Sequence, residues 1–238
     1  FDDPGVRRLA ERATVIGYGR SADADWRVTD IDLGPTPSFT LSRNGLAHRV
    51  ELEHPGLHVV MNAAGVLALL GETGFDLDCA IAGLREFGGV RRRFEVKARV
   101  GGISIVDDYA HHPTEVASTI EAARTMTNGH LWVVFQPHRY TRTAGLAPAF
   151  GAPLSGADRV IVTDVYGAGE QPQPGVTGRL VEEAVRAGGG KVEYVERLAD
   201  VPSHLVPSLR PGDTLVLMGA GDVATIWTDI VDQIGDDR

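Results

Sequence analysis

Several features that mark particular classes of protein are scarce or missing in this sequence of 238 residues. There is one cysteine, Cys79, so no internal disulfide can form, and a reducing compartment, the cytoplasm, is expected. No apolar run approaches the roughly 20 residues that a membrane-spanning helix needs. The 23 basic residues are outnumbered by 32 acidic ones, giving a formal net charge of −9. This balance argues against a general nucleic-acid binder, which needs clustered lysine and arginine.

Two further absences concern the start of the chain and its motifs. The sequence opens at Phe1 without an initiator methionine or a signal peptide, so we expect it to begin inside a longer protein. The pattern GxxxxGK[ST] does not occur anywhere in it. A phosphate-binding loop of that type is therefore excluded from these residues.

The first half of the chain combines strand patterns with later helical ones. A short helical pattern at 5–12 precedes strand-like runs separated by Gly and Pro turns, at 13–18, 26–33, 38–42 and 48–52. Asn44-Gly45 predicts a hairpin turn between the last two runs. Helical patterns follow at 59–70 and 77–86. This order indicates the tail of an α/β domain.

The second half alternates strands and helices. Apolar runs typical of strands lie at 103–106, 131–135, 159–163, 192–195 and 214–218. Helix-length segments lie between and after them, at 113–125, 146–154, 178–186, 201–209 and 223–234. This alternation predicts an α/β fold, a parallel sheet with helices on both faces, whose strand-to-helix turns form a ligand-binding edge. The boundary between the halves is expected near residues 90–95.

The densest cluster of reactive side chains follows the strand at 103–106. Asp107, Asp108, Tyr109, His111 and His112 fall within six residues, at the start of a predicted helix. A turn alone needs fewer such groups, although a plain turn with exposed histidines stays an alternative. A metal site is another, because Asp and His are good ligands. Adjacent histidines point in different directions, however, and no regular His spacing elsewhere completes a ligand set.

Three more segments carry candidate binding residues. Arg139 and Arg142 follow the strand at 131–135 and are spaced to fork a carboxylate or a phosphate, unless they form a solvated basic turn. The run 91–93 consists of three arginines at the domain boundary, where a guanidinium can reach a ligand or belong to a basic linker. Asn62, on a predicted helix, can read an adenine edge or make an ordinary polar contact.

A glycine motif, Gly219-Ala220-Gly221-Asp222-Val223-Ala224, follows the last predicted strand and matches the dinucleotide-binding pattern GxGxxA. Only about 14 residues remain after Ala224, too few for the second strand that carries the ribose-binding acid. We therefore interpret the motif as a tight strand-to-helix turn.

Together, five ordered motifs resemble the Mur ligases, the amino-acid ligases of peptidoglycan synthesis. They are GVRRRFE at 89–95, DDYAHHPTEV at 107–116, FQPHRYTRT at 135–143, DVYGAGEQPQPGV at 164–176 and MGAGD at 218–222. Weaker matches, DDPGVRRL at 2–9 and HVVMNAAG at 58–65, extend the resemblance over essentially the whole chain.

The resemblance implies a three-domain enzyme in which an N-terminal domain binds the UDP-sugar, a central domain holds ATP and magnesium, and a C-terminal domain brings the amino acid. Residues 1–91 would be the later part of the central ATP-binding domain, and 92–238 the Rossmann-like C-terminal domain. The phosphate loop and the main Mg ligands would precede this chain, which is expected to be inactive alone. The family usually has His-Asn where this chain has His58-Val59.

The implied reaction is the ligation of L-alanine to UDP-N-acetylmuramate through an acyl phosphate made with ATP. FQPHRYTRT favours this alanine-adding activity over the related recycling of murein peptides. The resemblance assigns His58 and Asn62 to adenine, Asp108 to ribose and Arg93 to the phosphates. It assigns L-alanine to Tyr109, His111, Arg139 and Arg142, with His111 and Arg93 as catalytic residues and no metal ligand. Two alternatives are a noncatalytic nucleotide-binding module and a metal-dependent phosphohydrolase using Asp107, Asp108, His111 and His112.

Overall fold

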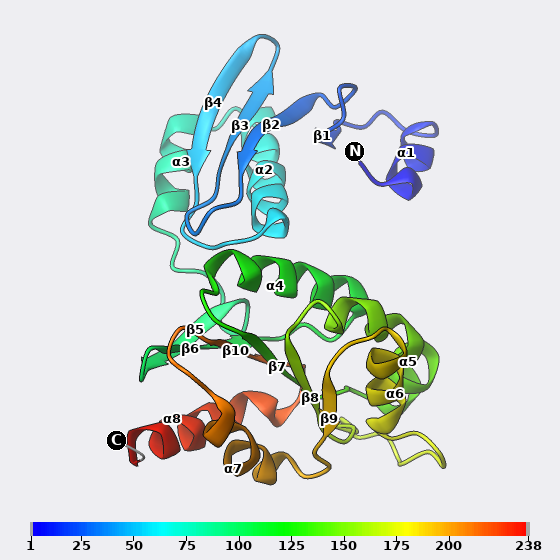
Figure 1. The fold of residues 1–238 in the computed structure, drawn as a ribbon. Coiled ribbons are helices and arrows are strands. Elements are labelled where there is room, and N and C mark those ends of the chain that lie inside the picture. The colour runs from blue at the N-terminus through cyan, green and yellow to red at the C-terminus, as the bar shows by residue number, and fades with distance from the viewer. Residues whose placement is uncertain (1, 237–238) are drawn as a thin grey trace. The chain divides into compact units, whose positions relative to one another are not determined.

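The computed structural model describes residues 2–236, and the chain divides between Gly88 and Gly89 into two compact units. We call residues 1–88 unit 1 and residues 89–238 unit 2 (Figure 1). Within the described residues, every helix is too short or too polar to cross a membrane.

Unit 1 contains a four-stranded sheet and three helices, with strand order β1-β2-β3-β4. The elements are α1 (Pro4–Ala10), β1 (Tyr18–Gly19), β2 (Trp26–Asp32), β3 (Ser38–Arg43), β4 (Leu46–Glu51), α2 (Leu57–Glu72) and α3 (Leu77–Arg85). Phe39, Leu41 and Leu67 are among its fully buried core side chains. The predicted hairpin turn is confirmed, because Asn44 and Gly45 both have positive φ between β3 and β4.

The strand predicted at 13–18 is wrong except at its last residue. Only Tyr18 and Gly19 pair with a neighbouring strand, β2. Val15 and Ile16 are 44% and 51% exposed, so this apolar run lacks the burial that a strand in the sheet would give it. Local β propensity was overridden by the lack of a partner strand within unit 1.

Unit 2 is built on a six-stranded sheet of order β5-β6-β10-β7-β8-β9. The strands from β6 to β9 are parallel, and β5 runs antiparallel to β6 at the edge. Its strands are β5 (Glu95–Val100), β6 (Ile103–Asp108), β7 (Leu131–Phe135), β8 (Arg159–Val162), β9 (Val192–Tyr194) and β10 (Thr214–Met218). Its helices are α4 (Pro113–Met126), α5 (Tyr140–Leu154), α6 (Arg179–Ala187), α7 (Val201–Leu205) and α8 (Trp227–Asp236), with 3-10 turns η1 (Leu198–Asp200), η2 (Val206–Ser208) and η3 (Asp222–Ile226).

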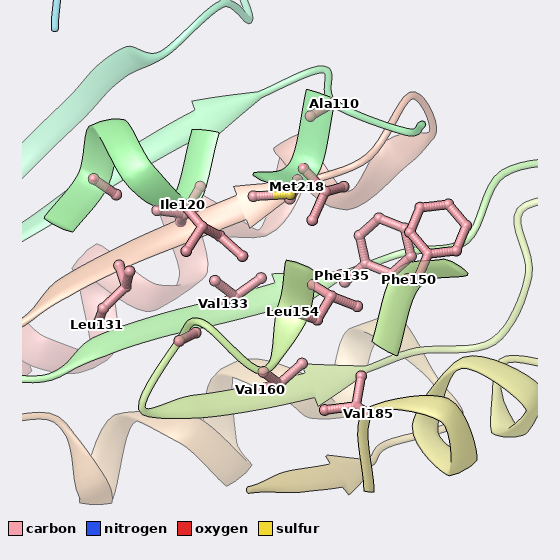
Figure 2. Packing of buried hydrophobic residues seen from close by; sticks show 14 of the residues in the cluster. Ala110, Ile120, Leu131, Val133, Phe135, Phe150, Leu154, Val160, Val185 and Met218 are labelled. Carbon is pink, nitrogen blue, oxygen red and sulfur yellow. The ribbon is translucent and has the colours of Figure 1, made fainter. Parts of the chain in front are cut away.

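Helices cover both faces of this sheet, as predicted. Side chains of β7 alternate, so that Val133 and Phe135 face one core cluster while Trp132 and Val134 face the other. The first cluster packs against α4, α5 and α6, and Phe135 lies 4.9 Å from Phe150 of α5 between ring centroids (Figure 2). The second packs against α7 and α8. Each fully buried large apolar side chain contributes about 1.5–3 kcal/mol relative to exposure.

Three features of unit 2 differ from the predictions. The edge strand β5 was not predicted, because its charged and apolar residues alternate without forming an apolar run. Helix α5 begins at Tyr140, six residues before the predicted start at 146. The helices predicted at 201–209 and 223–234 are each divided, into α7 and η2 and into η3 and α8.

Candidate functional site

The candidate site lies at the carboxyl edge of the parallel sheet in unit 2. Strand β10 lies between β6 and β7 and pairs in parallel with both, so their carboxyl ends are neighbours. The carboxyl end of β6 and the turns that follow the three strands bring together the residues at 107–112, 219–222 and 136–139. In open α/β sheets this edge is where ligands bind.

Asp108 ends β6 and organises the surrounding backbone. Its side chain is only 4% exposed. Oδ2 accepts the amide hydrogen of Phe94 at 2.9 Å, and Oδ1 accepts that of Ala110 at 2.7 Å. Burial raises the pKa of Asp108 despite these two bonds. The predicted contact with ribose stays a prediction, and the carboxylate would have to share one of these bonds to make it.

Asp107 points to the other side of the strand and is 1% exposed. Its Oδ2 accepts a hydrogen bond from Arg92 Nε at 3.3 Å. Its Oδ1 is buried without a hydrogen-bond partner among residues 2–236. Burial raises the pKa of Asp107, and the Arg92 guanidinium opposes that shift. Thus, within residues 2–236, one oxygen of the Asp107 carboxylate is hydrogen-bonded, to Arg92, and the other is buried without a partner.

His111 is held in one tautomer by its neighbours. Its Nδ1 lies 2.9 Å from the carbonyl oxygen of Tyr109 and 3.4 Å from Glu115 Oε2. Both of these atoms are acceptors, so Nδ1 carries the hydrogen, and the lone pair of the neutral imidazole is on Nε2. Glu115 also accepts the amide hydrogens of His111 and His112, at 3.0 and 3.2 Å, which fixes the turn.

Glu115 stays ionised in this turn. Burial by itself would raise the pKa of Glu115. Hydrogen bonds from the His111 and His112 amides, together with the nearby His111 and Arg93 side chains, outweigh burial, so the pKa is lowered. His112 caps α4 by accepting the amide hydrogen of Thr114 on Nδ1. These hydrogen bonds fix the first turn of α4 relative to the backbone of His111.

His138 takes the opposite tautomer. Its Nδ1 lies 3.1 Å from Nη1 of Arg142. A guanidinium has no acceptor, so His138 Nδ1 accepts and the ring hydrogen is on Nε2. Burial, the Arg142 charge and the nearby His111 lower the pKa of His138. The arginine is held by a neutral imidazole.

Four rings form a continuous row along the edge, which we call the ring row: Tyr109, His111, His138 and Tyr166. Successive centroid distances are 5.4 Å, 5.8 Å and 5.8 Å. The rings come from the turns after β6, β7 and β8. The structure thus brings Tyr109, His111 and Arg142 together. His138 and Tyr166 were in the quoted motifs but received no role, and only the folded topology reveals them.

Arg139 and Arg142 lie at the start of α5. Arg139 is the N-cap residue of this helix, without a side-chain cap hydrogen bond, and its φ of 68° is costly for a residue with a side chain. Glu170, from the loop after β8, accepts the amide hydrogen and hydroxyl of Thr141 at 3.0 and 2.7 Å. These two bonds lower the pKa of Glu170. Arg139 is exposed, and its guanidinium makes no hydrogen bond or ion pair in the described part of the chain.

The boundary arginine Arg93 reaches the same area. Its side chain is 50% exposed, with Nη1 3.7 Å from Glu115 Oε1. Its Cζ lies 5.5 Å from the centroid of the Tyr109 ring. A long, exposed ion pair of this kind is weak, so the guanidinium is free to bind another anion.

In unit 1, His58 and Asn62 both belong to α2. They are four residues apart, a spacing that places them on one side of the helix. Asn62 is exposed and His58 is half-buried. Their predicted contacts with adenine stay predictions.

The glycine motif is a packed turn. Gln136 Nε2 donates to Asp222 Oδ1 at 2.7 Å, and Gln136 Oε1 accepts the amide hydrogen of Val223 at 3.2 Å. A Cβ at Gly221 would overlap Gln136 Oε1 and lie 2.6 Å from Cγ of Tyr166. The start of η3 is thus filled by a side chain. This supports the interpretation as a tight turn.

The acidic and imidazole groups of the edge do not converge on a metal position. Among residues 2–236, no three or more His, Cys, Asp or Glu side chains are grouped to hold a metal ion. The Asp108 oxygens face backbone amides, and Asp107 Oδ2 faces Arg92. This arrangement does not support a phosphohydrolase built on Asp107, Asp108, His111 and His112, and these residues do not fit Mg either.

Known proteins resemble this chain in sequence and in fold. A family model described as the Mur ligase, glutamate ligase domain, matches residues 92–221. UDP-N-acetylmuramate–L-alanine ligase of Cutibacterium acnes is 43% identical over 239 residues, covering 97% of this chain and 51% of the relative. The ligase of the same name from Kineococcus radiotolerans is 42% identical, covering 99% and 51%. The chain thus spans about half the length of the curated relatives that it matches.

Among solved structures, UDP-N-acetylmuramate–alanine ligase of Thermotoga maritima has a TM-score of 0.81 and 25% identity, covering 97% of this chain and 50% of that one. A MurF ligase from the same organism, in complex with ADP, shares the fold, with a TM-score of 0.76, 18% identity and coverage of 100% and 53%. Since the family model matches more than half of the residues, and the relatives and folds agree with it, the chain belongs to the Mur ligase family.

Proposed function

We propose that this chain supplies the amino-acid-binding part of an ATP-dependent ligase that joins L-alanine to UDP-N-acetylmuramate in cytoplasmic peptidoglycan synthesis. The names of the curated relatives support the substrates. The pairing of an imidazole lone pair with guanidinium groups at one sheet edge supports amino-acid binding. Residues 92–238 would be the C-terminal domain, and residues 1–91 part of the central ATP-binding domain.

The observation that carries the proposal is the link between His111 and Arg142 through His138. An amino acid carries its amine and its carboxylate on the same carbon, so its site needs an acceptor and a cation close together. His111 offers the Nε2 lone pair, and the next ring along the ring row holds Arg142. Arg142 uses one of its five N–H groups on His138, which leaves others for a bidentate grip on carboxylate. Exposed Arg139 adds a second positive charge.

In the proposed reaction, ATP transfers its γ-phosphoryl group to the muramoyl carboxylate, which yields an acyl phosphate and ADP. The L-alanine amine, once neutral, attacks the acyl carbon, and phosphate leaves as the amide forms. His111 Nε2 accepts the proton that the ammonium must lose. Glu115, with its lowered pKa, lies 3.4 Å from Nδ1 and stabilises the resulting imidazolium. The side chains at the sheet edge align the reactants, which lowers the barrier by positioning them.

Four residues are proposed to contact the nucleotide: Arg93, His58, Asn62 and Asp108. Within residues 2–236, the ion pair of the Arg93 guanidinium is the long contact with Glu115, so the guanidinium can turn to phosphate oxygens. Asn62 and His58 on α2 are proposed to contact adenine. Asp108 is proposed to contact ribose. To do so, its carboxylate would share with the ribose one of the oxygens that now accept the backbone amides of Phe94 and Ala110. No step is assigned to Mg, because the described residues do not group into a site for it.

The function can be tested with a chimera that joins the first half of a curated relative to this chain. With ATP, UDP-N-acetylmuramate and L-alanine, the expected products are the alanyl amide, ADP and phosphate. Arg142→Met should abolish product formation, and Arg91→Met should not. A folded chimera that makes no product, or one that accepts murein peptides in place of alanine, would contradict the proposal. Unchanged activity in Arg142→Met and His111→Ala would contradict the site.

A further inference from the structure

The three arginines of the boundary run have different surroundings. Arg91 is exposed, and its guanidinium makes no hydrogen bond or ion pair within residues 2–236. Arg93 is half exposed beside Glu115. Arg92 is 28% exposed and is the arginine that the interior of unit 2 engages. The proposed reaction assigns no role to Arg92.

The Arg92 guanidinium joins two neighbouring strand ends. Nε donates to Asp107 Oδ2 of β6 at 3.3 Å, and Nη2 donates to the carbonyl oxygen of Gly219 after β10 at 2.7 Å. The same group lies with Cζ 4.9 Å from the centroid of the Tyr109 ring. A planar group can make two in-plane hydrogen bonds and one face contact at once. A lysine ammonium cannot reproduce that combination.

Backbone contacts place Arg92 as firmly as its side chain does. Its carbonyl oxygen accepts the amide hydrogen of Tyr109 at 2.7 Å, and its own amide donates to Glu95 Oε2 at 2.9 Å. Its φ is 59°, a left-handed conformation that local bonds must hold. Tyr109 is therefore fixed by Arg92 at both its main chain and its ring.

We infer that Arg92 is a positioning residue that fixes Tyr109 and, through it, the ring row at His111. Tyr109 is the direct link, because its carbonyl accepts from His111 Nδ1 and its ring meets the His111 ring at 5.4 Å. Loss of the guanidinium leaves the Tyr109 ring without its contact on that side. The orientation of the His111 lone pair then becomes less defined. The consequence for catalysis rests on the proposed function, whereas the positioning itself does not.

The experiment uses the 238-residue chain without ligand first. Nuclear magnetic resonance of the histidine and tyrosine rings is compared between wild type, Arg92→Lys and the matched control Arg91→Lys. In Arg92→Lys we expect shifted and broadened Tyr109 and His111 resonances. Those of His204, which contacts Glu193 elsewhere in unit 2, should not move. Arg91→Lys should match the wild type throughout.

A titration with L-alanine then measures the functional consequence. We expect the dissociation constant for L-alanine to rise about 10-fold in Arg92→Lys. This is the size of effect expected when the site loses roughly one charge-assisted hydrogen bond. If the wild-type resonances do not shift when L-alanine is added, the proposed function is contradicted. The ligand-free comparison would still test whether Arg92 positions Tyr109 and His111. Unmoved Tyr109 and His111 resonances in Arg92→Lys would overturn the inference.

A second pair of variants guards against simple misfolding. Removing Arg92 leaves Asp107 buried without a cation, so Arg92→Met is combined with Asp107→Asn to remove that charge. The double variant should recover the melting temperature but keep the disturbed Tyr109 and His111 resonances. Recovery of the ring resonances together with stability would show that Arg92 serves only to neutralise Asp107, and would overturn the inference.

Discussion

Arg142 donates a hydrogen bond to Nδ1 of His138, with 3.1 Å between Nη1 and Nδ1. This contact requires a neutral imidazole, because a protonated ring would set one donor against another. It also turns one edge of the guanidinium toward the ring row, so the rest of its N–H groups are held in a defined direction. The arginine is thereby oriented before any ligand arrives.

The first prediction concerns ring hydrogens. His111 should carry its hydrogen on Nδ1 and His138 on Nε2, because their Nδ1 atoms face an acceptor and a donor respectively. Nitrogen-15 chemical shifts measured above pH 7.5 would distinguish the two tautomers. His112 is the internal control, since its Nδ1 accepts from Thr114 and should report the Nε2–H form. Finding the same tautomer at His111 and His138 would refute this geometry.

The second prediction is a pH dependence of stability. The pKa of His138 is lowered from its ordinary 6.5 by burial, then by Arg142 and His111. Below pH 6.5 the unfolded chain therefore binds more protons than the folded one, and the free energy of unfolding falls as pH drops toward the folded pKa. His138→Asn keeps an acceptor for Arg142 but does not titrate. Chemical denaturation from pH 7.5 to 5 should show a smaller loss of stability in that variant, and parallel curves would exclude His138 as the cause.

The third prediction concerns Arg142 in the complete ligase reaction. Arg142→Lys replaces a planar fork with a point charge, so it should not be conservative. Losing a charge-assisted hydrogen bond costs about 1.5–3 kcal/mol. We expect kcat/KM for L-alanine to fall roughly 10- to 100-fold, with much less change in the KM for ATP. A variant that weakens ATP and spares alanine would instead assign the arginine to phosphate.

The fourth prediction compares two glycines of one helix. A Cβ at Gly151 would lie 2.5 Å from the carbonyl oxygen of Ala184, where α5 packs closely on α6, so Gly151→Ala should destabilise by about 1–3 kcal/mol. Gly145 is exposed in the same helix with nothing within 4 Å of a Cβ, and Gly145→Ala should stabilise by about 0.5–1 kcal/mol. Thermal melts of both variants test the α5–α6 contact. Equal effects of the same sign would show that this packing is wrong.

The fifth prediction concerns where unit 2 begins. Phe94 is 3% exposed in its core, and its amide is held by Asp108. A segment starting at Gly89 should therefore melt cooperatively, while one starting at Glu95 should lose about 3–5 kcal/mol, as expected for losing a buried Phe. The melting temperatures of the two segments decide this. Equal stability would mean that the core does not need residues 89–94.

The apolar strands of unit 2 could be read from the sequence because their signal is local. The runs at 131–135 and 214–218 coincide with β7 and β10 residue for residue. Strand β5 could not be found in this way, since an edge strand with one exposed face has no apolar run, although Gly101-Gly102 after it marks a turn. The early start of α5 was hidden because its first turn is capped by Glu170, far along the chain.

Residue types at the candidate site were predictable, and their relations were not. The sequence cluster names Tyr109 and His111, but neither motif alone shows that His138 lies between His111 and Arg142. That relation depends on the placement of β10 between two strands that precede it. The same holds for Arg92, whose partners Asp107 and Gly219 are brought to it by two different strands.

The central position of β10 has a consequence during synthesis. Strands β6 and β7 leave the ribosome before β10, each with one side facing the gap that β10 fills. Until residues 214–218 emerge, these two strands present unpaired edges, which are prone to join other chains. The nascent chain is thus exposed to aggregation between the synthesis of β7 and that of β10, and a chaperone that shields exposed strands would act in that interval. The carbonyl of Gly219, which Arg92 binds, also becomes available only after β10 has been made.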